Sequence, residues 1–310
     1  MLIALGSSLG GFATLRVSLV NWFDRNRAKA VAFSQLGFSI GGLSVPLLVL
    51  AMEAWGWRAT AFGSCVIILL IGLPLVPLVQ LRPQDIGEVP DGIDQPEPDS
   101  STPAAPIRDF TAREAMRTSS FWLISIGHAL ALLTVSAMMV HLVPHLIEGL
   151  DYSVAQAGGV VALLTGFQLL GQLSGGYLGD RFNKRFICAL CMVAHAAGLV
   201  LVTFASSFLM VFAFAILHGI AWGTRGPLMV AMRADYFGSR SFGTIMGFSS
   251  LIVMLGMSFG PIFAGLMADI HGDYQLGLSL LAGFSLLGSL CFLAALPPRL
   301  PVRSQTQEAA

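Results

Sequence analysis

The sequence predicts an all-α membrane protein in which a bundle of transmembrane helices makes up most of the chain. Hydrophobic residues are 55% of the 310 residues and charged residues only 11%, with a mean hydropathy of +0.77. Soluble domains carry about 25% charged residues. The apolar residues also gather into stretches of about 20, the length that an α-helix needs to cross a bilayer. The formal net charge of zero argues against nucleic acid as a partner.

Nine apolar stretches are predicted to cross the membrane. One polar segment interrupts them, because residues 82–120 contain the run PDGIDQPEPDSSTPAAP, whose Pro, Asp and Ser content is typical of a flexible linker. Three spans precede this linker and six follow it. In chain order, the predicted spans cover residues 2–22, 27–51, 58–81, 121–147, 153–178, 186–207, 209–232, 242–268 and 274–297.

Glycine is frequent within the spans and recurs at a spacing of four residues. Gly37 and Gly41 lie in the second span, and Gly171 and Gly175 lie in the fifth. Small side chains let two helices approach closely, which matters in lipid because the hydrophobic effect does not drive helices together there. Both glycine pairs are therefore predicted to be helix-contact positions.

The Lys and Arg residues predict the orientation of the chain. Of the 17, 14 fall in the linker, the C-terminal tail and every second loop, including Arg233 and Arg240 after the seventh span. Arg58 falls on the other side, while Arg16 and Arg225 lie within spans. By the positive-inside rule, the linker and the C-terminus are cytoplasmic. The expected location is the plasma (inner) membrane.

Two regions of the chain, residues 6–46 and 219–261, resemble each other. Each consists of a Gly-rich span, a turn with aromatic and basic residues, and a second Gly-rich span that ends near a proline. The repeat extends over six spans, which is the plan of transporters built from two six-helix halves. Three helices are therefore expected before Met1. The predicted units are 1–81 (the last three helices of an N-terminal half), 82–120 (a cytoplasmic linker), 121–298 (a complete six-helix C-terminal half) and 299–310 (a cytoplasmic tail).

The turn at residues 175–185 reads GGYLGDRFNKR. It resembles the cytoplasmic signature of the major facilitator superfamily, G-x-L-A-D-R-x-G-R-K. Gly179 replaces an alanine, and Asn183 replaces a glycine, a mild change because Asn tolerates left-handed turns. NWFDRNR before GFSIGG, and ADYFGSR before a Gly-rich span, are similar to the monocarboxylate and oxalate/formate branch. The resemblance implies a twelve-helix transporter whose first three helices this chain lacks.

The resemblance also implies a gating role for the charged residues of this turn. In the family, the signature Asp and Arg latch the cytoplasmic gate against a neighbouring helix end. We expect the positive N-terminal end of the eighth span to favour the carboxylate of Asp180. The alternative is that these side chains are solvated and only determine the topology. The candidate gating residues are Asp180, Arg181, Lys184 and Arg185.

Arg225 is the first candidate for substrate binding. It lies 12 residues before Phe237, hence about 18 Å deep at 1.5 Å per residue, where a charge is costly and usually faces a cavity or a partner. Because no acid lies equally deep in the spans, its partner is a backbone carbonyl, an acid on a missing helix or an anionic substrate, whose carboxylate its planar fork suits. Arg16 is a second candidate, although it is shallow enough to reach the cytoplasm.

Uncharged polar residues complete the candidate site. His128 is either a proton carrier, since histidine titrates near neutral pH, or a hydrogen-bonded core residue. Gln168 and Gln172, one helical turn apart, can bond to substrate or to a neighbouring helix. His141 and His145 have a spacing that permits a metal site, but without further ligands we interpret them as interfacial histidines. No metal and no cofactor are predicted.

Together these features predict a secondary active transporter that works by alternating access. The expected substrate is a small organic anion such as a monocarboxylate, with a co-transported proton or a counter-transported anion as its partner. The alternatives are an exporter of other small molecules, and a transport-inactive fragment or misassigned start of such a transporter. An enzyme is not predicted, because the spans contain no nucleophile–base pair, metal cluster or acidic dyad.

Overall fold

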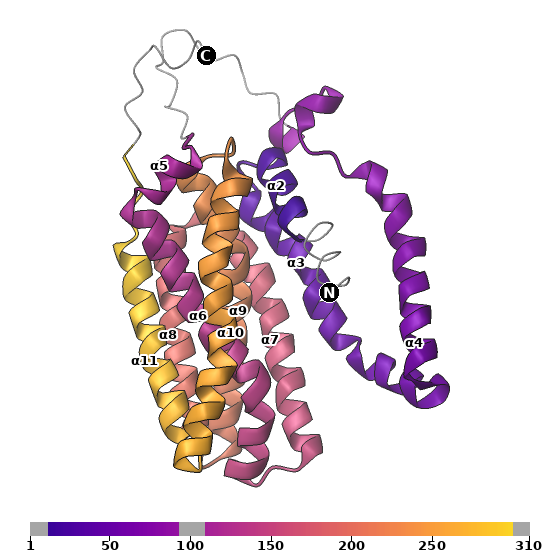
Figure 1. The fold of residues 1–310 in the computed structure, drawn as a ribbon, viewed down its shortest axis with the longest axis vertical. Coiled ribbons are helices and arrows are strands. Elements are labelled where there is room, and N and C mark those ends of the chain that lie inside the picture. Colours follow the sequence, from indigo (N-terminus) through magenta and orange to yellow (C-terminus); the bar gives the residue numbers. More distant parts are fainter. Residues whose placement is uncertain (1–11, 93–108, 300–310) are drawn as a thin grey trace.

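The computed structural model describes residues 12–92 and 109–299, and the regular structure in these ranges is helical (Figure 1). The predicted all-α class is confirmed. A π-helical turn, His145–Gly149, directly follows the α-helix Ser119–Pro144. The α-helices are α2 (Phe12–Trp22), α3 (Arg27–Leu43), α4 (Val45–Leu75), α5 (Ala112–Met116), α6 (Ser119–Pro144), α7 (Val154–Arg181), α8 (Lys184–Thr203), α9 (Phe208–Phe237), α10 (Phe242–His271) and α11 (Gln275–Ala294).

Within the described residues, 7 helices are long and apolar enough to cross a membrane, namely α4 and α6 to α11. The helices α6 to α11 follow the six predicted later spans within a few residues. The second predicted span, 27–51, differs, because α3 ends at Leu43 and Pro46 stands in the first turn of α4, a position where its missing N–H costs no hydrogen bond. A bend follows at Gly56, whose φ of 79° favours glycine.

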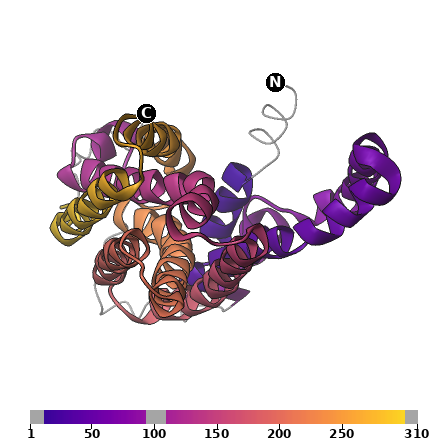
Figure 2. The same cartoon turned by 90° about the horizontal axis from the view of Figure 1, so that it is seen from below.

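The helices α6 to α11 form one bundle (Figures 1 and 2). One end of the bundle contains α5 and the C-terminal end of α11 (Figure 1), and we call it the linker end. We call the opposite end the loop end. At the linker end, α2 and α3 lie against the bundle. Toward the loop end, α3 diverges from the bundle (Figure 1). The helix α4 stands apart, and none of its most apolar stretch is buried (Figure 1).

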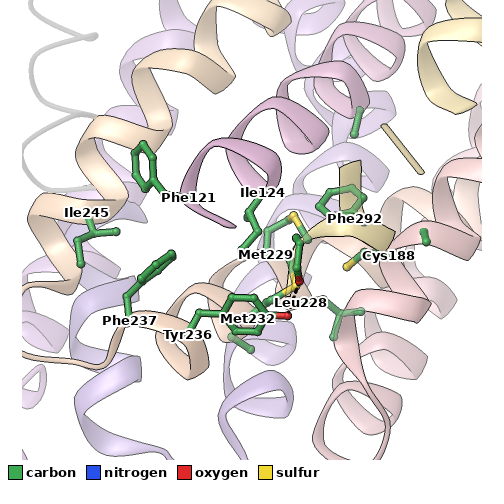
Figure 3. Close-up of a cluster of buried hydrophobic side chains, with 14 of the residues drawn as sticks. Phe121, Ile124, Cys188, Leu228, Met229, Met232, Tyr236, Phe237, Ile245 and Phe292 are labelled. Carbon is green, nitrogen blue, oxygen red and sulfur yellow. Dashed lines mark hydrogen bonds between the residues drawn. The ribbon is translucent and has the colours of Figure 1, made fainter. Parts of the chain in front are cut away.

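Buried hydrophobic side chains near the linker end bring five helices of the bundle together (Figure 3). Because lipid is as apolar as these side chains, close packing rather than exclusion of water holds them together. The fully buried members include Ile124 of α6, Cys188 of α8, Leu228 of α9, Ile245 of α10 and Phe292 of α11.

Glycines allow α7 and α9 to approach closely. A Cβ atom on Gly171 would lie 2.5 Å from the carbonyl oxygen of Ile220, and one on Gly175 would lie 2.5 Å from that of Thr224. The predicted contact at this pair is confirmed. The same prediction for Gly37 and Gly41 of α3 is wrong for the described residues, since no atom lies within 4 Å of a Cβ built at either position.

Candidate substrate-binding cavity

A cavity of about 440 Å³ lies between α2, α3 and the six-helix bundle. Its wall includes an apolar portion formed by methionines and aromatic residues such as Met139, Met254 and Trp222. The structure brings all the predicted binding residues to this one cavity, although they come from four different helices. They are Arg16 of α2, His128 of α6, Gln168 and Gln172 of α7, and Arg225 of α9.

Arg225 is almost completely buried, with 1% of its surface exposed. Its Nε and Nη1 atoms have no hydrogen-bond partner within the part of the chain that the structure describes. Among the described residues that line the cavity, none is acidic. A buried guanidinium with unsatisfied donors is costly, so this arrangement favours an anionic ligand in the cavity.

Arg233 also lines the cavity, and its predicted position in a loop after the seventh span is wrong. The helix α9 continues to Phe237, so Arg233 lies inside it and is 1% exposed. Its guanidinium donates to the Ser249 hydroxyl, with nitrogen–oxygen distances of 3.0 and 2.8 Å, and to the Met229 carbonyl at 2.8 Å. The aromatic pair Tyr236 and Phe237 was the signal for the true helix end, since such residues mark the membrane interface.

His128 is hydrogen-bonded to this second arginine. Its Nδ1 atom lies 3.3 Å from an Nη2 atom of Arg233. Because a guanidinium can only donate, Nδ1 accepts, and the proton of the neutral ring is on Nε2. This geometry favours the hydrogen-bonded alternative for His128 over the proton carrier.

The glutamines connect the bundle to α3. The Gln172 side-chain oxygen accepts a hydrogen bond from the Ser39 hydroxyl at 3.0 Å, and Gln168 lies one turn away with 8% of its surface exposed. Gln35 of α3, which sequence reasoning missed, also lines the cavity and lies beside Gly226. Gln35 lies within the second predicted span as a single glutamine, without the one-turn pairing that drew attention to Gln168 and Gln172.

The predicted gating residue Asp180 caps a helix, but not the predicted one. Its carboxylate accepts the backbone N–H groups of Ala28 at 2.8 Å and Lys29 at 3.2 Å, in the first turn of α3 rather than α10. Close approach permits this, because a Cβ on Gly176 or Gly179 would lie 2.8 Å from an alanine Cβ of α3. The positive end of the helix favours the carboxylate there.

An ion-pair network lies beside this cap. The Asp235 carboxylate of α9 bonds to Arg27 of α3 at 2.9 Å and to Lys184 at 2.7 Å. Arg27 and Asp235 were missed, because the sequence does not reveal which helix ends meet. The other predicted gating residues contact rings near them in the sequence. The guanidinium carbon (Cζ) of Arg181 lies 4.1 Å from the Tyr177 ring centroid. The Cζ atom of Arg185 lies 4.7 Å from the Phe186 ring centroid.

Asn183 does not adopt the left-handed conformation expected of it. With φ of −65° it is the N-cap of α8, and its side-chain oxygen accepts the N–H of Arg185. Asn is among the preferred N-cap residues. The substitution of the family's glycine is therefore explained by helix capping.

The segment after α4 returns to the turn between α2 and α3. The Asp91 carboxylate accepts the backbone N–H groups of Asp24 at 3.0 Å, Arg25 at 2.8 Å and Asn26 at 3.3 Å. Partial burial alone raises the pKa of Asp91, but these hydrogen bonds outweigh it and leave the pKa below its usual value. The first described stretch of the linker, residues 82–92, is thus bonded near its end to this turn.

His141 and His145 bond to the backbone of neighbouring helices. Each places its Nε2 atom 2.9 Å from a carbonyl oxygen, that of Pro261 for His141 and that of Val202 for His145. Both histidines thus bond within the helix bundle near the loop end. Within the described ranges, no group of three or more His, Cys, Asp or Glu side chains could hold a metal ion.

The fold and the cavity define an α-helical, multi-pass integral membrane protein. The family model described as Major Facilitator Superfamily matches residues 1–167 and again residues 124–310. The chain therefore belongs to the major facilitator superfamily, as its signature turn predicted.

Known relatives support this assignment. The chain is 27% identical to the MFS transporter asaE of Aspergillus flavus over 279 residues (88% of this chain and 58% of the relative). It is 22% identical to the Benzoate transport protein of Acinetobacter baylyi over 297 residues (86% and 61%). It is 26% identical to Monocarboxylate transporter 11 of Homo sapiens over 302 residues (94% and 60%). The chain thus spans about six-tenths of the length of these relatives.

Proposed function

We propose that this chain acts as a secondary active transporter whose cavity binds a small organic carboxylate. The observation that carries the proposal is the charge of the cavity, which is lined by Arg16, Arg225 and Arg233 and, among the described residues, by no acid. Two relatives are named for benzoate and for monocarboxylates, which supports a carboxylate over other anions.

Each part of the cavity wall has a separate role in this proposal. The guanidinium of Arg225, whose Nε and Nη1 have no partner among the described residues, binds the carboxylate through two parallel hydrogen bonds. The amides of Gln168 and Gln172 orient further polar atoms of the substrate, while Met139 and Met254 contact its apolar body. A volume of about 440 Å³ is within the range of small-molecule sites.

We infer that transport proceeds by alternating access between residues 1–81 and residues 121–298, joined by the cytoplasmic linker 82–120 and followed by a cytoplasmic tail at 299–310. The Asp180 cap and the Arg27–Asp235 ion pair hold α3 to the bundle at the linker end, while α3 diverges toward the loop end (Figure 1). The linker end is cytoplasmic under the positive-inside rule, and the membrane is the plasma membrane. Opening to the cytoplasm then requires the Asp180 cap to break.

The binding proposal is tested with radiolabelled benzoate on detergent-purified protein and with benzoate uptake into proteoliposomes. Arg225→Lys keeps the charge but loses the fork, so we expect benzoate affinity to fall at least about tenfold; Arg225→Met should abolish binding. Arg58→Lys is the matched control, because Arg58 lies over the Trp57 ring of α4, away from the cavity. Full affinity in Arg225→Lys, or equal competition by uncharged benzamide, contradicts the proposal.

The gating proposal is tested with Asp180→Asn. Expression should stay normal and benzoate uptake should change, because an amide has one acceptor oxygen for the two backbone N–H groups of α3. Asp151→Asn, an exposed change of the same kind at the loop end, is the control. Unchanged uptake in Asp180→Asn refutes a gating role.

A further inference from the structure

Two histidines are buried against each other between α8 and α9. His195 is 0% exposed and His218 is 1% exposed. Their Nδ1 atoms lie 3.1 Å apart and their ring centroids 4.4 Å apart. Both lie outside the set of residues that lines the cavity. Titratable residues buried inside membrane helices are rare and by default functional.

The geometry fixes how many protons the neutral pair holds. In a hydrogen bond between two Nδ1 atoms, one ring donates and the other accepts, so the donating neutral ring has a bare Nε2 atom. The Nε2 of His195 is buried and has no hydrogen-bond partner within the described chain. The neutral pair therefore holds two protons and has one free basic nitrogen.

A third proton fits this arrangement without rearrangement. Once it binds the bare Nε2, that ring becomes an imidazolium whose Nδ1–H already points at the neutral Nδ1 of its partner. Hydrogen bonds from an ionised donor are about twice as strong as neutral ones, which offsets part of the cost of the buried charge. The proton comes from water on one side of the membrane and returns to water on the other.

Among the described residues, one permanent charge acts on both rings. This is Arg225, on the same helix as His218. Cys191 lies one turn from His195, and a thiol is neutral at physiological pH. Leu164, Phe167 and Gln168 of α7 pack against Gly219, next to His218. The other titratable side chains on the packed helices are Cys188 of α8, Cys291 of α11, His128 and His141 of α6, Arg16 of α2, Arg233 of α9, Tyr177 of α7 and Tyr236 of α9, and the charged residues near the ends of α3, α7, α8, α9 and α10.

Arg225 links the pair to the cavity. It lies seven residues from His218, about 10.5 Å at 1.5 Å per residue. At that distance and an effective dielectric constant of about 20, the positive charge of Arg225 weakens the binding of a proton to the histidine pair roughly tenfold. An anion on Arg225 cancels its charge and lets the pair take up a proton. By reciprocity, the proton tightens binding of the anion by the same factor.

We propose that the His195–His218 pair is a proton-binding site linked to the anion site at Arg225, so that a carboxylate and a proton cross the membrane together. The inference rests on the proposed function and deepens it, since it selects proton co-transport over exchange for a second anion.

The first experiment measures benzoate binding by the purified full chain at about pH 6 and about pH 8, where benzoate stays ionised. We expect affinity about tenfold higher at the lower pH, with proton uptake on binding detected by a pH-sensitive dye. His195→Gln and His218→Gln should lose both effects. His271→Gln, at the exposed end of α10, should keep both. Benzoate binding without pH dependence or proton uptake overturns the proton site and leaves the carboxylate site intact.

The second experiment needs neither a ligand nor a substituted histidine. In protein with ¹⁵N-labelled histidine, NMR coupling across the Nδ1–Nδ1 hydrogen bond identifies the pair, and its protonation is followed against pH. In Arg225→Met the midpoint should move up by about one pH unit, because the repelling charge is gone. An unchanged midpoint overturns the linkage, whether or not benzoate binds.

Discussion

The helices α4 and α9 are both apolar enough to cross a membrane, yet they lie in opposite environments. The most apolar 18 residues of α4 have a mean hydropathy of 2.4 and are 0% buried. The corresponding 18 residues of α9 have a mean hydropathy of 1.5 and are 50% buried. The more hydrophobic helix is therefore the one that stands alone. Hydropathy reports compatibility with lipid, while close contact between helices depends on small and polar residues.

The residues of the two helices explain this difference. In α9, Cβ atoms on Gly219 and Gly223 would collide with the α7 backbone, whereas Gly63 and Gly72 of α4 have nothing within 4 Å. Of these two helices, α9 is also the one with buried charges, Arg225 and Arg233. The less hydrophobic helix thus carries both the packing and the candidate site.

The largest expected effect is on stability, and it separates a glycine of α9 from a glycine of α4. Gly223→Ala forces a methyl group into the Gln168 carbonyl and should destabilise the protein by roughly 3 kcal/mol, the upper range for overpacking. Gly63→Ala should be neutral or stabilise by up to about 1 kcal/mol through helix propensity. Thermal unfolding in detergent measures both. Equal stability of the two variants would break the comparison.

A smaller effect is expected for the acidic residues of the two helices. Asp235→Asn of α9 loses the ion pairs with Arg27 and Lys184 and should cost about 1–2 kcal/mol. Glu53→Gln of α4 removes an exposed charge and should change stability by less than about 0.5 kcal/mol. The same unfolding assay applies. A loss in Glu53→Gln as large as that in Asp235→Asn would contradict the assignment of α4 as unpartnered within the described chain.

The smallest effect concerns the contact that follows α4. The pKa of Asp91 is lowered in the folded protein. Its ionised carboxylate therefore holds the turn at residues 24–26 when the pH is above the ordinary aspartate pKa of about 4, and releases the turn as the pH falls through the lowered pKa of the folded protein. A spin label at Gln84→Cys should therefore become more mobile on acidification. Adding Asp91→Asn should make the label mobile at every pH. A label that is insensitive to both changes contradicts the contact.

The sequence predicted those features that depend on one helix at a time. The depth of Arg225 followed from helical rise, and the cavity residues His128, Gln168 and Gln172 followed from the cost of polar groups in lipid. The later spans followed from apolar length. Each of these requires only the chain itself and the thickness of a bilayer.

Features that depend on which helices meet were predicted less well. Gly171 and Gly37 have the same four-residue spacing, but only Gly171 meets another helix in the described chain. Asp180 was expected at α10 and caps α3. Arg233 was assigned to a loop because the rule for basic residues counts charges near helix ends without knowing where the helix stops.

The most direct test of the anion site is the distance between a bound carboxylate and the Arg225 guanidinium. Rotational-echo solid-state NMR of lipid-reconstituted protein, with ¹³C-carboxylate benzoate and ¹⁵N-guanidinium arginine, measures it. We expect a carbon–nitrogen distance of about 4 Å or less, with the signal lost in Arg225→Lys and kept in Arg58→Lys. Bound benzoate that gives the same signal with Arg225 replaced, or none in the unaltered protein, would contradict the site.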